Sequence, residues 1–311
     1  MIHAELQDRY ALEGELGRGG MATVFLVRDR KHDRQVALKV LDPELTSTVG
    51  PRRFKREIRF TARLQHAHIL PLLDSGVAGH LLYYVTPYVK GETLRERIAR
   101  GGPLPLEEAI RIAMDVAAAL DYAHRQGIVH RDIKPENILL SDQQAMVTDF
   151  GIARAMSPEG DPGITATGGV VGTLAYMSPE QAVGSRKVDG RADVYSLACV
   201  LYEMLVGRPP FVDATTEGVL RKHLYETPPP IEGARPDVPA PIRRALAAAL
   251  AKAPASRTRT AAEFARALGA TDAPAGRLRA SLSGGGVWRL APVAALLLAL
   301  AALAAWRACA A

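Results

Sequence analysis

Cysteine is scarce in this sequence. Only two of the 311 residues are cysteines, Cys199 and Cys309, so the disulfide framework of a small secreted protein is excluded. Cys199 lies in the apolar run SLACVLYEML and is interpreted as a small core residue. Hydrophobic residues make up 48% of the chain, which is ample for a core. The length suits one domain of two lobes with an appendage.

A nucleic-acid-binding module and a secretory signal are also missing. The net charge is only +6, and basic residues cluster locally, as in residues 52–56, with acidic residues elsewhere in the chain. Because no basic stripe accompanies a recognisable module, we expect no nucleic-acid partner. The first ten residues, MIHAELQDRY, lack the basic and then apolar pattern of a signal peptide. We therefore expect the residues up to about 285 to lie in the cytoplasm.

One long apolar run occurs near the end of the chain. Leu290–Trp306 is seventeen residues without a charge. As a helix it is about 25 Å long, slightly short of a ~30 Å hydrocarbon core, and snorkelling of Arg289 and Arg307 covers the difference. We expect a single-pass transmembrane helix over 288–306 that anchors the chain in the inner cell membrane, with no extracellular sensor domain after it. The alternative is an Ala/Leu-rich helix buried in a soluble protein. Residues 269–287, rich in Ala, Gly, Ser and Arg, are expected to be a flexible linker.

The stretch HRDIKPEN, residues 130–137, carries the chemistry of the sequence. It places Asp132, Lys134 and Asn137 on one short loop, and the triplet Asp149-Phe150-Gly151 follows. A carboxylate that accepts a proton, a cation beside a moving phosphoryl group and two oxygen-bearing side chains for magnesium are what phosphoryl transfer needs.

These motifs resemble those of protein kinases. The runs YVTPYVKGETLRERI and GTLAYMSPEQA are similar to bacterial Hanks-type serine/threonine kinases. The resemblance implies an α+β fold of two lobes, with a small antiparallel sheet and one helix in the N-lobe and a mainly helical C-lobe. It predicts a kinase domain over residues 10–268, divided into lobes at about 10–89 and 90–268. It also implies ATP and Mg²⁺, with Mn²⁺ as an alternative, and protein substrates with Ser or Thr.

Residues 10–41 alternate apolar runs with turns, which predicts three antiparallel strands. The first turn resembles the glycine-rich loop over ATP phosphates, because backbone amides approach phosphate oxygens closely only where side chains are absent. The glycines concerned are Gly17, Gly19 and Gly20. Ala22 stands where the family usually has a third glycine, and a positive φ there would cost about 1 kcal/mol. On this ground alone, a catalytically weak pseudokinase that acts as a membrane-tethered scaffold is the alternative function.

By the same resemblance, a strand lysine and neighbouring residues form the nucleotide site. Lys39 binds the α- and β-phosphates and pairs with Glu57 on the following helix. Thr86 lies behind the adenine, which bonds to the Pro87 carbonyl and the Val89 N–H. The base is sandwiched by four side chains: Leu16, Val24, Ala37 and Leu139. The run 81–89 is predicted to be a strand that ends at Pro87, and residues 69–73 are predicted to be another.

The roles in the catalytic loop also follow from the resemblance. Asp132 orients the substrate hydroxyl and accepts its proton, and Lys134 neutralises the γ-phosphoryl group. Asn137 and Asp149 hold Mg²⁺, and Phe150 and Gly151 complete the second motif. Apolar residues at helical spacing from Ala109 to Ala123 predict the helix that leads into this loop.

Residues 149–180 have the extent of an activation segment. Thr165 and Thr167 match paired autophosphorylation sites, whose phosphates would pair with Arg131, although a merely solvated loop remains the alternative for either one. Thr173 resembles the threonine that bonds to the catalytic loop. Asp193 is expected to accept bonds from the backbone of that loop, and Glu180 is expected to pair with Arg257. A homodimer formed at the membrane would allow autophosphorylation in trans.

Overall fold

The computed structural model describes residues 4–19, 22–43, 51–142, 144–150 and 174–270. The chain divides into two compact units, residues 1–271 and 272–311, and every described residue belongs to the first. No helix within these described ranges has the length and apolar character needed to cross a membrane. The predicted transmembrane segment, 288–306, lies outside them, as does the predicted linker beyond residue 270.

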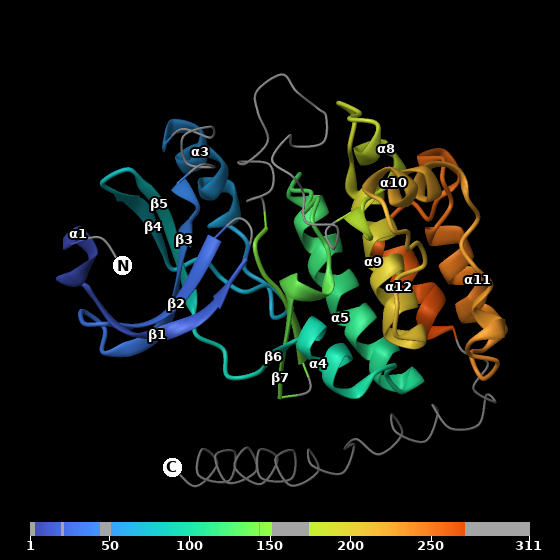
Figure 1. Cartoon of the computed structure of the whole chain (residues 1–311), viewed down its shortest axis with the longest axis horizontal. Helices are drawn as coiled ribbons and strands as arrows, with labels where there is room; N and C mark the ends of the chain where they lie inside the picture. Colours follow the sequence, from blue (N-terminus) through green and yellow to red (C-terminus); the bar gives the residue numbers. More distant parts are fainter. Residues whose placement is uncertain (1–3, 20–21, 44–50, 143, 151–173, 271–311) are drawn as a thin grey trace, which may run out of the picture. The chain divides into compact units, whose positions relative to one another are not determined.

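A five-stranded antiparallel sheet forms one part of the unit, and helices form most of the rest (Figure 1). The strand order is β1-β2-β3-β5-β4. The three strands predicted between residues 10 and 41 are confirmed, as is the strand that ends at Pro87. A short helix, α1 (Ala4–Gln7), precedes them, and the strands are β1 (Tyr10–Arg18), β2 (Ala22–Asp29), β3 (Arg34–Leu41), β4 (Asp74–Ala78) and β5 (Leu81–Pro87).

The two faces of this sheet carry separate hydrophobic clusters. On one face, Leu41 and Leu82 pack with Phe54 and Ile58 of helix α3 (Pro51–Thr61). On the other, Val27 and Val36 belong to a cluster that includes Leu6 of α1. The two clusters follow from the strand pleat, which sends successive side chains to opposite faces.

Helix α3 has one buried stripe on an otherwise basic surface. Phe54, Glu57, Ile58 and Thr61 recur at helical spacing and are all buried. Glu57 is therefore part of the packed face and is not an ordinary surface charge.

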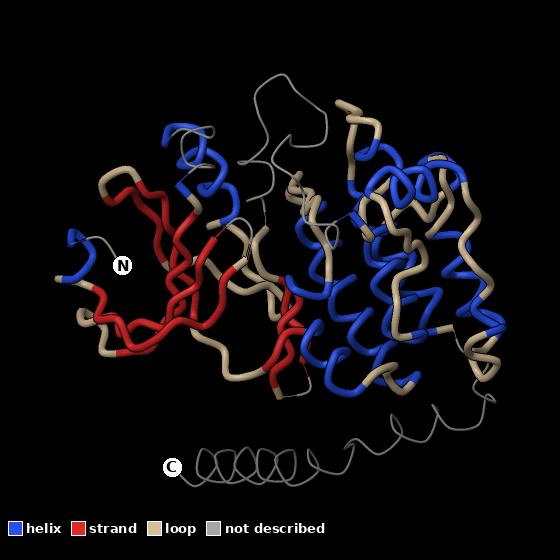
Figure 2. The backbone as a smooth tube through the Cα atoms, in the orientation of Figure 1, coloured by secondary structure: helices blue, strands red, loops and turns tan. Residues whose placement is uncertain are grey.

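The C-terminal part is mainly helical, as Figure 2 shows, and surrounds one hydrophobic core. A small sheet of order β6-β7-β8 lies between it and the five-stranded sheet. Its strands are β6 (Glu92–Thr93), β7 (Ile138–Ser141) and β8 (Gln144–Val147). The helices are α4 (Leu94–Gly101), α5 (Leu106–Arg125), α8 (Pro179–Ala182), α9 (Gly190–Val206), α10 (Thr216–Tyr225), α11 (Ala240–Ala249) and α12 (Ala261–Gly269), with 3-10 turns η1 (Pro135–Asn137), η2 (Ile231–Gly233) and η3 (Pro254–Ser256).

Helices α5 and α9 form the centre of this core. The predicted stripe of α5 is confirmed, since the residues from Ala109 to Ala123 at helical spacing are fully buried. Helix α9 is buried nearly all round, which marks a central helix. Asp189 caps its first turn, and Gly207 ends it with φ +85°, a conformation that glycine adopts without strain.

The strand predicted over residues 69–73 is wrong. Ile69 forms only an isolated bridge with Val147, and the regular strand begins at Asp74. Pro71 lies in the middle of the predicted run, and its missing N–H prevents a continuous ladder there. Ile69 is buried although it belongs to no regular strand, whereas Pro71 is exposed and Leu72 and Leu73 are only partly buried.

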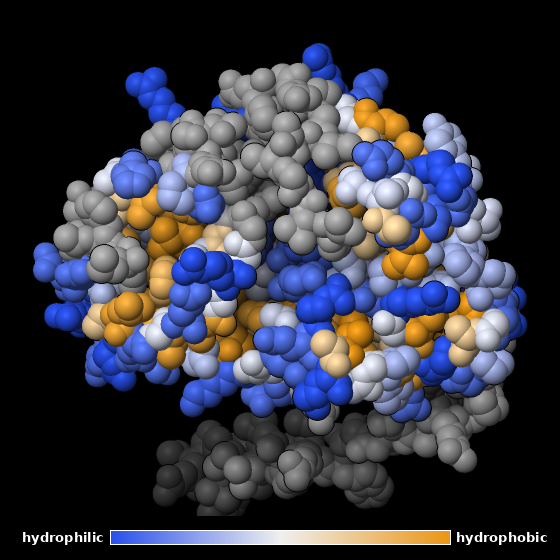
Figure 3. Space-filling view, in the orientation of Figure 1, coloured by the Kyte–Doolittle hydropathy of each residue, from blue (hydrophilic) through white to orange (hydrophobic). Residues whose placement is uncertain are grey.

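The surface of the described residues is mixed. Figure 3 shows hydrophobic patches separated by hydrophilic residues on one face of the molecule. Among the large apolar residues that are exposed, Leu12 and Leu16 both come from β1. Scattered apolar residues of this kind are normal on a protein surface.

Candidate active site

The catalytic loop follows helix α5, and its backbone donates hydrogen bonds to a buried aspartate. The helix ends at Arg125, and Gly127, with φ +74°, follows the cap residue Gln126 as the chain turns toward His130. Asp193 of α9 is fully buried, and its two oxygens accept hydrogen bonds from the backbone N–H groups of His130 and Arg131, both at 2.8 Å. The backbone of the loop is thereby fixed to the central helix, as predicted for Asp193.

The electrostatics of Asp193 suit this role. Burial alone would raise the pKa of its carboxyl group, but a 2.7 Å hydrogen bond and the charge of His124 outweigh burial and lower the pKa. The carboxylate therefore stays ionised and accepts three hydrogen bonds, which is a strong arrangement in a dry interior.

The His130 ring connects the loop to the segment before Asp149. Its Nε2 donates to the Thr148 carbonyl at 2.7 Å, and its Nδ1 accepts from the Asp132 N–H at 3.2 Å. These partners fix the neutral tautomer with the proton on Nε2, because a carbonyl can only accept and an N–H can only donate. The ring also packs edge-on against Phe150 at 4.6 Å between centroids.

Asp132, Lys134 and Asn137 meet in one polar cluster. Lys134 Nζ lies 2.8 Å from Asp132 Oδ2, and the Asn137 side-chain nitrogen donates to the same oxygen at 3.1 Å. The same nitrogen also donates to the Asp132 backbone carbonyl at 2.8 Å, which turns the amide oxygen of Asn137 away from Asp132. The structure therefore brings together the three residues that the spacing of the motif selected.

Lys39 reaches Asp149 across 110 positions of the sequence. Its ammonium group forms an ion pair with Asp149 Oδ2, while the Tyr84 hydroxyl donates to Asp149 Oδ1 at 2.5 Å. Burial would raise the pKa of Asp149, but the charge of Lys39 and these two hydrogen bonds lower it. The carboxylate is held as an anion by one charged and one neutral donor.

The expected pairing of Lys39 with Glu57 is not formed among the described residues. Lys39 pairs with Asp149, while Glu57 Oε1 accepts from Arg56 Nε at 3.3 Å. Two buried carboxylates each need a cation: Asp149, 16% exposed, has Lys39, whereas Glu57, 6% exposed, has Arg56 instead. Glu57 still lies on the α3 face that packs against the sheet of Lys39.

The predicted nucleotide-site residues of the N-lobe share one face of the sheet. Gly17 pairs with Val24, Val24 pairs with Lys39, and Ala37 pairs with Thr86 on the next strand. Residues paired directly across strands project to the same side. Pro87 ends β5, Val89 follows it and Leu139 lies on β7, all partly buried, whereas Leu16 is 45% exposed.

The two described glycines of the glycine-rich turn, Gly17 and Gly19, have open space above their backbone. A Cβ added to Gly17 would meet nothing within 4 Å, and one added to Gly19 would meet only the Ala22 carbonyl at 3.9 Å. Ala22 itself is buried in β2, and it is not among the described non-glycine residues with positive φ. The expected cost of Ala22 therefore does not arise, and Ala22 does not favour a pseudokinase.

Comparison with known proteins decides the family. The model of the protein kinase domain matches residues 10–265. The chain belongs to the protein kinase family. The serine/threonine-protein kinase PknB of Mycolicibacterium smegmatis is 44% identical over 265 residues, which are 83% of this chain and 42% of that protein. PknB of Mycobacterium leprae shows the same identity and coverage. A probable PknB of Bifidobacterium longum is 42% identical over 82% of this chain and 38% of its own length. The chain thus spans about two fifths of these relatives.

Kinases use ATP with a divalent metal, and the residues present fit such a metal. No cluster of three or more His, Cys, Asp or Glu side chains suited to a metal occurs in the described part of the kinase domain. A magnesium ion does not need one, because it typically takes one or two protein oxygens and completes its shell with phosphates and water. The amide oxygen of Asn137 and the carboxylate of Asp149 are two ligands of that kind.

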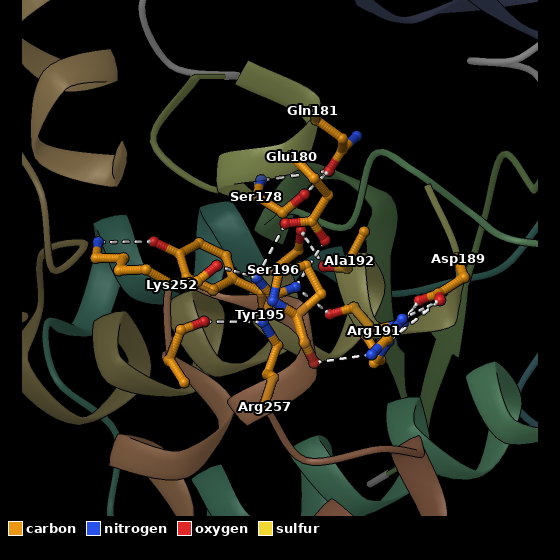
Figure 4. A network of polar contacts seen from close by, with 12 residues as sticks. Ser178, Glu180, Gln181, Asp189, Arg191, Ala192, Tyr195, Ser196, Lys252 and Arg257 are labelled. Atoms are coloured by element: carbon orange, nitrogen blue, oxygen red, sulfur yellow. Dashed lines mark hydrogen bonds and ion pairs between the residues drawn. The ribbon is translucent and has the colours of Figure 1, made fainter. Parts of the chain in front are cut away.

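Figure 4 shows a second polar network in the C-lobe of the kinase domain, which joins Glu180 of α8 and Arg191 of α9 to Arg257. Arg257 and Glu180 form a buried bidentate pair, with N–O distances of 2.7 and 2.9 Å. The remaining N–H groups of Arg257 donate to the carbonyls of Ala251, Arg191 and Lys252, so all five of its donors are used. The predicted Glu180–Arg257 pair is formed.

Three contacts around the site of the kinase domain were not predicted from the sequence. Tyr84 on Asp149 and His124 on Asp193 have been described, and the Gln181 side chain donates to the Arg131 carbonyl at 2.8 Å. Tyr84 offered one signal, since a polar hydroxyl in a buried strand needs a partner. The identity of each partner depends on tertiary contacts between distant segments.

Several predicted sites lie outside the described residues. They are Gly20 of the glycine-rich loop, Gly151 of the second motif, and Thr165, Thr167 and Thr173 of the activation segment.

Proposed function

We propose that this chain is an ATP-dependent serine/threonine protein kinase whose kinase domain spans residues 10–268. The observation that carries the proposal is the meeting of Asp132, Lys134 and Asn137 in one hydrogen-bonded loop, together with the Lys39–Asp149 contact. The similarity to serine/threonine-protein kinases supports the choice of substrate class. Protein side chains with a Ser or Thr hydroxyl are the proposed acceptors.

Each residue has a proposed task. Asp132 orients the acceptor hydroxyl and takes its proton, while Lys134 neutralises charge on the transferred group. Asn137 and Asp149 would hold Mg²⁺, or Mn²⁺ in its place, and Lys39 would bind the phosphates. Bound metal–ATP supplies the phosphoryl group and part of the charge neutralisation. Val24, Ala37 and Thr86 are proposed to contact the adenine, a proposal that their common sheet face supports, and the other proposed contacts are Leu16, Pro87, Val89 and Leu139.

A transfer assay tests this function. We expect the purified full chain to move the γ-phosphate of ATP to a protein substrate or to itself, and Asp132→Asn to abolish transfer. Asp237→Asn is the matched control, because Asp237 is exposed and pairs only with Arg235 in the described structure. Equal activity in Asp132→Asn and the control would reject the proposal.

We also propose that autophosphorylation of Thr165 and Thr167 activates the kinase. Each phosphate adds about −2 charge and can pair with an arginine such as Arg131. The double change Thr165→Ala/Thr167→Ala should lower activity severalfold without abolishing it. Full activity of the double variant, measured with the same substrate, would remove this switch.

The apolar segment 288–306 is proposed to anchor the chain in the inner membrane, with the kinase domain in the cytoplasm. The support is its seventeen-residue uncharged run between two arginines. Tethering would raise the local concentration and favour a homodimer that phosphorylates itself in trans. Deletion of the residues after Gly286 should move the kinase to the soluble fraction and lower loop phosphorylation in cells. Unchanged fractionation would contradict the anchor.

A further inference from the structure

Tyr84 makes a buried contact that the proposed roles above do not use. Its side chain is only 2% exposed, and its hydroxyl donates to Oδ1 of Asp149 at 2.5 Å. A carboxylate oxygen can only accept a hydrogen bond, so the phenol hydroxyl is the donor in this contact.

The register of the sheet places Tyr84 beside Lys39. The two residues are direct partners on β5 and β3, so their side chains leave the same face of the sheet. The Lys39 ammonium lies 5.8 Å from the centre of the Tyr84 ring. The adjacent residue, Tyr83, projects to the opposite face and packs in the cluster beneath α1.

The two carboxylate oxygens of Asp149 therefore contact different donors. Oδ2 faces the Lys39 cation, whereas Oδ1 is held by the neutral Tyr84 phenol. A cation such as a metal ion can replace an ammonium group at Oδ2, since both are attracted by the same charge. A neutral donor at Oδ1 does not repel that ion, and it fixes the plane of the carboxylate.

We propose that the Tyr84 hydroxyl is a positioning group for the metal-binding carboxylate of Asp149, an inference that rests on the proposed kinase function. Tyr84 anchors Oδ1 so that Oδ2 is presented to the divalent ion. Hydrogen bonds of this kind to a metal-ligating carboxylate typically change metal affinity by about 10–100-fold when they are removed. Tyr84→Phe keeps the ring, which packs with Leu41 and Phe54, and removes only the hydroxyl.

Metal binding is the direct test, with Mn²⁺ as the probe and ADP present. Free Mn²⁺ would be followed by electron paramagnetic resonance on the full chain. We expect Tyr84→Phe to weaken Mn²⁺ binding about tenfold, and Tyr83→Phe, the matched control, to leave it unchanged. The affinity for ADP in EDTA should be the same in both variants. Raising Mg²⁺ in the transfer assay should restore much of the activity of Tyr84→Phe, which a merely structural defect would not allow.

The outcomes separate the two levels of inference. If Asp149→Asn loses Mn²⁺ while Tyr84→Phe binds it as well as or better than the natural chain, the positioning role is wrong and the kinase proposal stands. If the natural chain and Asp149→Asn bind Mn²⁺–ADP equally, the assignment of Asp149 as a metal ligand fails, and the role of Tyr84 fails with it.

Discussion

Removal of the Arg257 side chain should strongly destabilise the kinase domain. The guanidinium group is fully buried and forms a bidentate pair with Glu180, whose side chain is 9% exposed. Truncation in Arg257→Ala would leave the Glu180 carboxylate buried without its cation. Breaking a buried pair in this way typically costs about 3–5 kcal/mol. Three carbonyl groups would lose a donor in addition.

The effect is measured by urea unfolding and by thermal denaturation of the kinase domain. For a domain of this size, we expect the melting temperature of Arg257→Ala to fall by about 10 °C. Arg257→Lys should lie between this variant and the natural chain, because lysine keeps the charge but cannot form the planar two-bond contact. Arg259→Ala is the matched control, since Arg259 is exposed two positions away.

A double variant isolates the charge pair. In Glu180→Gln/Arg257→Met neither charge remains, so the double variant should be more stable than Arg257→Ala despite its second substitution. A loss below about 1 kcal/mol in Arg257→Ala, similar to Arg259→Ala, would refute the reasoning, because such a loss is typical of an exposed pair.

Three further predictions follow from buried contacts of the C-lobe. Asp193→Asn should lower the unfolding free energy, measured in urea, by about 3 kcal/mol, because the side-chain amide of asparagine cannot accept hydrogen bonds on both of its terminal atoms. The control Asp189→Asn should change the unfolding free energy little, because aspartate and asparagine are both good residues at a helix N-cap. His223 is fully buried, and burial together with the Lys252 charge lowers its pKa from 6.5 to about 3. Below about pH 6.5 the imidazole of His223 therefore binds a proton in the unfolded state but not in the folded state, so the free energy of unfolding should fall as the pH drops from 6.5 toward 3. In urea titrations at several pH values, His223→Phe should make this decline less steep. Gly190→Ala would place a Cβ 2.5 Å from His124 Nδ1 and should destabilise the domain by about 1–3 kcal/mol by thermal denaturation, while Gly233→Ala, which has open space, should not.

The sequence predicted the residues of the site better than their contacts. Asp132, Lys134 and Asn137 lie within six positions, so a short loop alone brings them together. The strands and the α5 stripe were also predictable, because local periodicity reports which side is buried. The Glu180–Arg257 pair required the family resemblance, since seventy-seven positions separate the two residues.

The contacts that escaped prediction depend on competition between partners in space. The sequence offers Lys39 two carboxylates, Glu57 and Asp149, and only the packed structure shows that Asp149 holds it. The sequence indicates only that Tyr84 is a strand residue, whereas the structure shows that its hydroxyl donates to Asp149, sixty-five positions away. Burial of a charge makes its pairing decisive, and burial depends on the whole fold.

Two strained residues connect the site to the rest of the domain. Arg131 and Asp149 both have positive φ, +70° and +64°, which costs about 1–2 kcal/mol for a residue with a side chain. Arg131 is held by bonds from its N–H to Asp193 and from Gln181 to its carbonyl. Asp149 is held by Lys39 and Tyr84. Because these restraints come from other elements of the fold, substitutions in β5, α8 or α9 should alter catalytic geometry without touching substrate.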